Sequence, residues 1–476
     1  MGLSYSAPRP TDEEKARRES AAAMTLRQLV SGSTVEGQDE ADEAPPPYSA
    51  RERATILSIS QMRGWEDTLL CDPKVPEFTT PNFEPGEKPI LASPHQPGGA
   101  TNIFRVPLMR KYNISEFELS QAYLFYWDKI EKANWFLEKI IETVNEDVSS
   151  RLVQKLLEDP VTDGGQWDML ANIVQKYGLV PHAIYPDTFN AQNSSKMNWL
   201  ITAKLREQGL VLRRLAKSPS AKERETLAET KEAFLQEIHG LVTIMLGPPP
   251  NPKEPFVWQY YDANGRAQEI CETPRAFARQ ATVQLNRAEV NPNRMLSLVN
   301  DPRNEYGRLL TVDKLGNVVE GRPITYINVD LKTMKSAAIA MLRAGHPIFF
   351  GCDVGKFYDA NLGVMDTELL DLALGFNVTL GMNKASRLET GESSMTHAMV
   401  LTGVHIEGNK PVRWRVQNSW GETVGDKGWF VMSDRWMDEY TYQMVVDSRF
   451  VSKEVQDILG QKPKVLPRWD PMGVLA

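Results

Sequence analysis

The sequence changes its hydrophobic periodicity along its length, and this change limits the possible folds more than any other feature. Residues 115–144 and 197–246 place apolar side chains at helical spacing among many charges, so we expect helices there, the first capped by Ser115. Later segments alternate β-branched and aromatic residues with polar ones between Gly, Asn and Asp turns, which is typical of strands. These segments are 322–331, 347–354, 397–408, 412–419 and 428–434. Helices followed by antiparallel strands predict an α+β fold.

Composition narrows the classes of function. The chain has 476 residues, 41% of them hydrophobic, which is enough for several domain-sized units. Its net charge of -8 argues against nucleic acid as a partner. Cys71, Cys271 and Cys352 are too widely spaced for a zinc site or a disulfide framework, so we expect no metal, no other cofactor and a reducing compartment. No apolar run reaches the roughly 18 residues of a membrane-spanning helix, and we expect a soluble protein.

The N-terminal residues 1–90 have a different composition from the rest. They contain few large apolar side chains, so folding there would not offset the loss of chain entropy, and we expect a disordered, low-complexity tail. Its start, "MGLSYS", fits N-myristoylation at Gly2, although a single acyl chain anchors weakly. The segment Pro45–Tyr48 is either an extended linker, which we favour, or a ligand for a WW domain. The acidic cluster "EGQDEADE" is untypical of a mitochondrial transit peptide, so we expect a cytoplasmic protein, with a mitochondrial location as the alternative.

Of the six histidines, His397 has the setting that best suits catalysis. It lies in "SSMTHAMVLTG", between small polar residues and an apolar strand, and Asn418 follows the strand "VRWRVQ". If these neighbouring strands pair, the two side chains meet, and the Asn carbonyl can fix one ring nitrogen of the histidine. The other ring nitrogen could then accept a proton from a thiol. The simpler interpretation, in which Asn418 ends a strand and Trp420 fills the core, stays open at this point.

These two strands resemble the His and Asn strands of the papain-like cysteine peptidases. The motifs "FELSQAYLFYWDKIEKAN", "DGGQWDM", "LVNDPRNEYG" and "WDPMGVLA" further resemble the bleomycin hydrolase family, over residues 101–476. The resemblance implies a papain-like fold with a helical insertion, aminopeptidase action on peptides and assembly into a homohexameric ring. It also implies a cleft lined by Gly164, Gly165 and Trp420, which the last residues, ending at Ala476, enter and restrict to free N-termini.

The same resemblance implies a division of the chain after the tail. Residues 91–186 would form the helical half of the catalytic domain, and 187–320 the helical insertion and oligomerisation region. Residues 321–460 would supply the antiparallel sheet half that carries His397 and Asn418, and 461–476 the C-terminal arm.

The nucleophile that the resemblance implies is missing from its expected place. In the family a Cys-Trp pair begins a buried helix and follows a glutamine that donates to the oxyanion. Here the residues before "TNIFRVPLMRKYN" read "SPHQPGGATN", without a cysteine; Gln96 is the candidate for the oxyanion glutamine. Cys71, Cys271 and Cys352 lack the helix N-terminus that lowers a thiol pKa. We therefore expect the chain as written to lack its nucleophilic segment and to be inactive.

The truncated helix carries a structural prediction. We expect it to begin at Thr101 or Asn102, with Pro107 close to its first turn, and to pack against the helix that contains "AYLFYW".

Three functions stay open for this sequence. The first is a cysteine aminopeptidase whose sequence here lacks one segment, and the second is a silent homologue that acts as an oligomeric binding module. The third, an acyltransferase with the same Cys-His chemistry, is disfavoured because the C-terminal arm would obstruct larger acceptors.

Overall fold

The computed structural model describes residues 98–115, 117–282, 290–420 and 423–474. The expected tail, Gly2, Pro45–Tyr48, Cys71, Gln96 and Ala476 lie outside this range. The chain divides into two compact units, Met1–Leu57 with Leu370–Gly381 and Ser58–Leu369 with Met382–Ala476. In its described part, the smaller unit contains helix α14 (Leu372–Phe376), whose N-cap Asp371 accepts from the Leu374 amide. All that follows concerns the larger unit.

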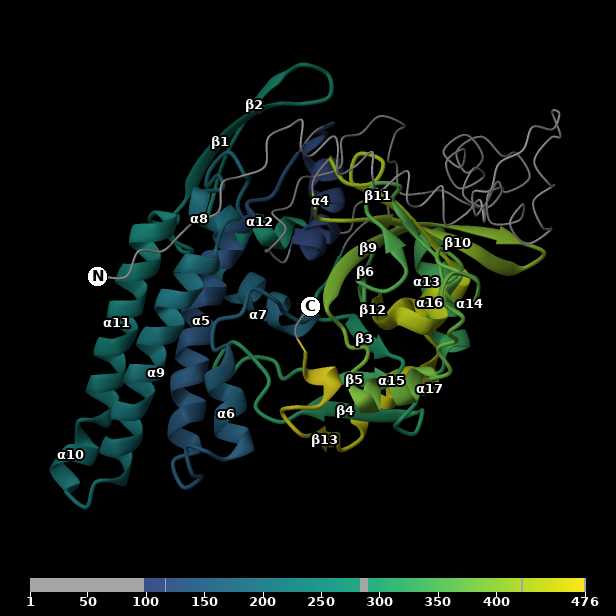
Figure 1. Ribbon diagram of the computed structural model, residues 1–476. Helices are drawn as coiled ribbons and strands as arrows, with labels where there is room; N and C mark the ends of the chain where they lie inside the picture. The colour runs from purple at the N-terminus through teal and green to yellow at the C-terminus, as the bar shows by residue number, and fades with distance from the viewer. Residues whose placement is uncertain (1–97, 116, 283–289, 421–422, 475–476) are drawn as a thin grey trace, which may run out of the picture. The chain divides into compact units, whose positions relative to one another are not determined.

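Three long helices pack side by side in this unit. Helix α5 (Gln121–Glu142) contacts α9 (Ser195–Lys217) and α11 (Leu227–Leu246), which also contact each other (Figure 1). Their facing side chains are buried and apolar: Phe136, Leu137, Leu205, Leu212, Ile238 and Val242. The helical pair predicted in residues 197–246 is therefore present, with the short α10 (Ala221–Glu225) in its connection.

Helix α5 begins later than the sequence pattern predicted. Its N-cap is Ser120, whose Oγ accepts from the Tyr123 amide at 3.1 Å, and Ser115 is not the cap. The residues just before it are held extended, because Leu119 forms a β-bridge with Pro181 and the Ser120 amide donates to Val180. This pairing with a distant segment competes with helix formation, and the sequence near Ser115 does not reveal it.

The remaining helices are shorter. Helix α7 (Trp167–Tyr177) ends at Gly178, with φ at 89°, as the glycine and the following proline predict. The other α-helices of this unit are α4 (Gly98–Tyr112), α6 (Arg151–Glu158), α8 (Phe189–Gln192), α12 (Pro274–Gln280), α13 (Leu331–Arg343), α15 (Lys384–Thr390), α16 (Asp434–Tyr440) and α17 (Lys453–Asp457), and the 3₁₀ turns are η1 (Ser448–Phe450), η2 (Ile458–Gly460) and η3 (Pro471–Gly473).

One large mixed sheet forms the second part of this unit, and a small hairpin stands apart from it (Figure 1). The strand order of the large sheet is β13-β4-β5-β3-β12-β6-β9-β10-β11-β8-β7. Its pairs are antiparallel except β3 with β5, β4 with β13, and β8 with β11. The strands are β3 (Met295–Val299), β4 (Arg308–Val312), β5 (Tyr326–Asn328), β6 (Ile348–Cys352), β7 (Tyr358–Asp359), β8 (Val364–Met365), β9 (His397–Glu407), β10 (Lys410–Gln417), β11 (Trp429–Ser433), β12 (Thr441–Asp447) and β13 (Lys464–Leu466), and the hairpin is β1 (Phe256–Tyr261) with β2 (Ala267–Glu272). The α+β class is confirmed.

Helix α4 differs from its prediction in two ways. It begins at Gly98, so Pro107 lies well inside it rather than in its first turn. It also packs mainly on strands β9 and β6 and on α12, not on α5. The ring of Phe104 stacks on Trp167 of α7, with centroids 5.9 Å apart. Burial of Ile103, Phe104 and Leu108 stabilises the helix enough to accommodate the proline, whose cost is about 3 kcal/mol.

Within the described residues, every helix is too short or too polar to cross a lipid bilayer.

Candidate active site

The sheet brings His397 and Asn418 together. His397 is the first residue of β9 and Asn418 follows the last residue of β10, and the two strands pair antiparallel with Gln417 opposite Val400. The Nε2 of His397 and the Oδ1 of Asn418 are 2.9 Å apart. The same Oδ1 accepts the Ser419 amide at 2.7 Å, so the orientation of the Asn418 side chain is fixed by two bonds. An oxygen facing Nε2 requires the proton on that nitrogen, which leaves Nδ1 as the basic position.

Trp420 covers this pair. The centroids of the His397 and Trp420 rings are 5.0 Å apart, and Trp420 also contacts Tyr358 and Phe430 edge-on. Asn418 is buried and His397 is half-buried. Burial lowers the pKa of His397 below its usual value, and the bond to Asn418 offsets part of that effect. The imidazole is therefore neutral at pH 7 and able to accept a proton.

A small cavity of about 30 Å³ lies between the helices and the sheet, and Ala398, which follows His397 in β9, is part of its wall. Its walls come from α5, the loop before α7, α7 itself, β6 and β9: Leu124, Asp128, Asp163, Gly164, Gly165, Gln166, Trp167, Met169, Leu170, Ile173, Phe349 and Ala398. Gly164 and Gly165, which the resemblance places in the cleft, lie in the wall of this cavity, whereas Trp420 is not among its lining residues. A Cβ atom on Gly165 would meet nothing within 4 Å, so the space beside this residue is open.

Two lysines that the sequence argument missed hold the glycine loop. The buried Lys129 donates to the Val161 carbonyl and lies 2.5 Å from Asp163, and Lys132 donates to the carbonyls of Thr162 and Gly164. Both lysines project from α5 toward the loop before α7. Their sequence signal is weak, because α5 carries several other charged side chains; only their burial among apolar residues shows that the two lysines require partners.

The described part of the C-terminal arm, residues 461–474, reaches the wall of the same cavity. The Nε2 of Gln166, which lines the cavity, donates to the Val474 carbonyl at 3.0 Å. Met472 and Gly473 just before it are buried. Gln166 was not predicted as a site residue, although it directly follows the two predicted glycines.

Neither cysteine in the described residues is a reactive partner for the histidine. Cys271 is exposed on the β1–β2 hairpin, outside the large sheet that carries His397. Cys352 ends β6 and is fully buried. Its burial, and to a smaller extent the neighbouring charge of Asp353, raise the pKa of its thiol well above the usual value.

The described residues also contain no cluster of three or more His, Cys, Asp or Glu side chains that could hold a metal ion.

A helix packed on a mostly antiparallel sheet, with a His-Asn pair at the strand ends, defines a papain-like cysteine peptidase fold. The structure is similar to that of PepW from Lactobacillus rhamnosis HN001 (DR20), with a TM-score of 0.76 and 35% identity, covering 90% of this chain and 100% of that one. Residues 98–473 match the model of the Peptidase C1-like family, and the chain belongs to this family of cysteine-type peptide hydrolases.

Relatives from distant organisms agree with this assignment. Mouse bleomycin hydrolase is 44% identical over 384 residues, which cover 79% of this chain and 82% of the relative. Aminopeptidase C of Listeria innocua is 42% identical over 380 residues, covering 79% and 83%. The yeast protein cysteine proteinase 1, mitochondrial, is 42% identical over 385 residues, covering 79% and 78%.

Proposed function

We propose that this protein has the architecture of a cysteine aminopeptidase that removes N-terminal residues from peptides. The observation that carries this proposal is the 2.9 Å contact between His397 and Asn418. It is supported by the cavity whose wall contains Ala398, next to His397 in the chain, and Gln166, which binds the C-terminal arm. A histidine held in this tautomer suits proton transfer, and an arm bound at Gln166 would restrict the site to the free N-terminus of a peptide. The names of the relatives, bleomycin hydrolase and aminopeptidase C, support the same activity.

The chemistry follows from the free Nδ1 of His397. A thiol at the start of α4 would transfer its proton to Nδ1, and the thiolate would attack the carbonyl carbon of the first peptide bond. When the C–N bond breaks, the leaving amine takes the proton from His397, and a water molecule then hydrolyses the thioester with His397 as base. Asn418 orients the ring and transfers no proton itself. Gln96 is our candidate donor to the oxyanion.

We further propose that the chain as written is inactive, because it lacks a reactive thiol at the start of α4. Cys352 is buried and has a raised pKa, and Cys271 lies on the separate hairpin. These two observations favour the second candidate function for this particular chain, a silent homologue that keeps the cleft as a peptide-binding module. The division into domains, a homohexamer and a cytoplasmic location belong to the proposal, on the resemblance to the bleomycin hydrolase family; native mass spectrometry tests the hexamer.

The deciding experiment compares two proteins on aminoacyl fluorogenic amides in reducing buffer. The first is the chain as written, for which we expect no hydrolysis sensitive to iodoacetamide. In the second, the segment before Ala100 is replaced by the corresponding segment of Listeria innocua aminopeptidase C, and we expect thiol-dependent activity. Hydrolysis by the unaltered chain would contradict inactivity, whereas a folded but inactive chimera would contradict the aminopeptidase architecture.

Variants of the active chimera assign the roles of the residues. His397→Ala should remove most activity, and Asn418→Ala should lower it less, because the asparagine only orients the ring. His405→Ala serves as the control, since this residue lies late in β9 next to Glu407. Equal losses from His405→Ala and His397→Ala would show that the wrong histidine had been chosen.

A further inference from the structure

The path of the C-terminal arm is fixed at several points before it reaches Gln166 in the cavity wall. Strand β13 pairs in parallel with β4, with Leu466 opposite Val312. The chain then turns, and the short η3 begins after Asp470. Met472 is buried in an apolar cluster that also contains Tyr326 and Met169 of α7, and its carbonyl accepts from the Tyr326 hydroxyl at 3.3 Å. Beyond Met472, the described arm is held by the bonds that Gly473 and Val474 accept through their carbonyls.

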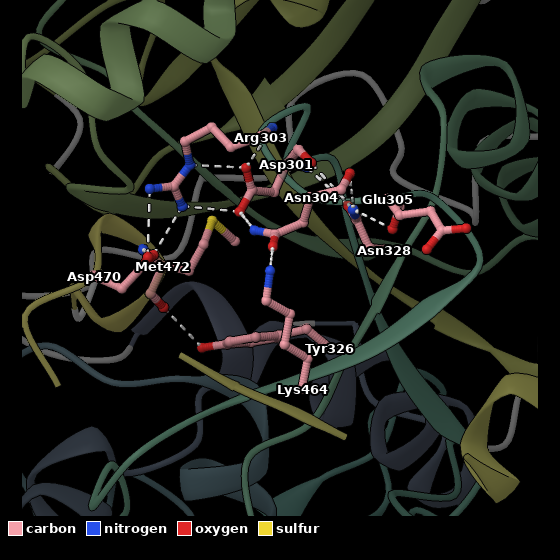
Figure 2. A network of polar contacts seen from close by, with 9 residues as sticks. All are labelled: Asp301, Arg303, Asn304, Glu305, Tyr326, Asn328, Lys464, Asp470 and Met472. Atoms are coloured by element: carbon pink, nitrogen blue, oxygen red, sulfur yellow. Dashed lines mark hydrogen bonds and ion pairs between the residues drawn. The ribbon is translucent and has the colours of Figure 1, made fainter. Parts of the chain in front are cut away.

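One arginine joins the arm to the sheet through two carboxylates (Figure 2). The guanidinium of Arg303 binds Asp301 through Nε at 2.9 Å and Nη2 at 2.8 Å. Its Nη2 also donates to Asp470 Oδ1 at 2.8 Å, and its Nη1 to Oδ2 at 3.4 Å. Asp301 is fully buried, and Arg303 and Asp470 side chains are each only 12% exposed, so solvent screens this bridge weakly.

The loop that carries Arg303 is held rigid by residues outside the arm (Figure 2). Asn328 of β5 donates to the carbonyls of Asp301, Asn304 and Glu305, and its Oδ1 accepts the Asp301 amide. The Asn304 side chain donates to Asp301 Oδ2 at 2.8 Å. The position of Arg303 is therefore set by the sheet, and Asp470 docks onto a prepared site.

Asp470 couples that site to the end of the chain. Its Oδ1, which accepts from Arg303, also accepts the Met472 amide at 2.9 Å and so starts η3. The Gly473 carbonyl accepts from Arg468, and the Val474 carbonyl accepts from Gln166 in the cavity wall. A change in the position of Asp470 therefore changes how Gly473 and Val474 meet the wall of the cavity.

We propose that Arg303 is a positioning residue: by bridging Asp301 and Asp470 it holds the C-terminal arm in the cleft and thereby sets the selectivity for free N-termini. The placement of the arm stands by itself, whereas the consequence for selectivity rests on the proposed function. Removal of the arginine leaves two carboxylates facing each other, one of them buried, which favours release of the arm.

The test of arm placement needs no catalytic activity. Carboxypeptidase Y is added to the full chain, and the loss of the residues "VLA" from its C-terminus is followed by intact-mass spectrometry. We expect Arg303→Met to speed this loss by about tenfold or more, since cleavage follows the population of the released arm. Arg308→Met is the matched control, because Arg308 pairs with Glu305 on the exposed surface of the same region, and its rate should equal that of the parent.

A second variant controls for the possibility that Arg303→Met unfolds the protein. Asp470→Asn alters the arm itself and keeps the buried Asp301–Arg303 pair, so the fold should persist while the loss of "VLA" still accelerates. Equal rates for the parent, Arg303→Met and Asp470→Asn, with unchanged circular dichroism, would overturn the proposal. In the active chimera, Arg303→Met should raise the hydrolysis rate of N-acetylated peptides relative to peptides with a free N-terminus. If carboxypeptidase Y removes "VLA" faster from this variant but the relative hydrolysis rates stay the same, Arg303 anchors the arm and its proposed role in selectivity is wrong.

Discussion

Cys352 of β6 and His397 of β9 lie directly opposite each other in the sheet register, yet no hydrogen bond joins the thiol and the ring. Residues that are opposite in an antiparallel pair have neighbouring side chains, so Cys352 is the described cysteine placed nearest to the histidine by topology. Its burial raises the thiol pKa, and a nucleophile requires the thiolate. Position in the sheet is therefore insufficient for reactivity.

The first prediction concerns alkylation of these cysteines. Iodoacetamide at pH 7.5 should modify the exposed Cys271 in the native protein and leave Cys352 unmodified, as measured by peptide mass spectrometry. In guanidinium chloride both should react, which controls for intrinsic reactivity of the peptides. Native Cys352 labelled as fast as Cys271 would contradict its assignment as an inert core residue.

A second prediction concerns the protonation of His397. Its imidazole should titrate below pH 6.5 in ¹⁵N-correlated NMR spectra, with the resonance assigned by His397→Gln. Asn418→Leu should lower this pKa further, because it removes a hydrogen bond that stabilises the charged ring. Asn418→Asp should raise the pKa, because it places a negative charge beside the ring. A midpoint above 6.5 in the parent, or an unchanged midpoint in Asn418→Leu, would contradict the geometry.

The lowered pKa of His397 also makes the stability of the folded protein depend on pH. A folded-state pKa below the unfolded value means that the unfolded chain binds the proton more readily. Above about pH 6.5 the titration of His397 therefore leaves the free energy of unfolding unchanged. As the pH falls below that value, the unfolded chain takes up the proton first, and the free energy of unfolding decreases progressively. In urea titrations, the parent should lose more stability than His397→Gln between pH 7 and pH 5.

The third prediction concerns the lysine that holds the glycine loop. Lys129→Met should lower the free energy of unfolding by about 3 kcal/mol or more, because Asp163 and the Val161 carbonyl lose a buried donor. Lys155→Met removes an exposed ion pair with Glu158 and should change stability by less than about 0.5 kcal/mol. Urea denaturation monitored by fluorescence measures both, and similar losses in the two variants would contradict a specific role for Lys129.

The fourth prediction compares two glycines with positive φ. A Cβ at Gly178 would lie 2.2 Å from the carbonyl carbon and oxygen of Pro274. Gly178→Ala should therefore lower the free energy of unfolding by about 3 kcal/mol or more. Gly391 has φ at 74° but open space around its Cβ position, and Gly391→Ala should cost only about 1 kcal/mol. Thermal unfolding curves of the two variants should differ clearly, and equal shifts would show that the contact with Pro274 can relax.

Some of the structure follows from local sequence. The strands at 397–407 and 410–417, the end of α7 at Gly178 and the pair α9 and α11 were predictable because periodicity and glycine act through the residues themselves. The juxtaposition of His397 and Asn418 was also predictable, since two neighbouring strands that pair antiparallel bring their opposite ends together. Each of these inferences requires information from only one or two adjacent segments.

Other features were decided by contacts between segments far apart in the chain. The start of α5 depends on the bridge between Leu119 and Pro181, and the partners of α4, the strands β9 and β6, lie more than 200 residues further along the chain. The Arg303 bridge joins a loop after β3 to the C-terminal arm, although nothing in either local sequence distinguishes this pair from a surface ion pair. Local propensity differs little between the alternatives at such positions, so burial and the partners available in the folded chain determine the outcome.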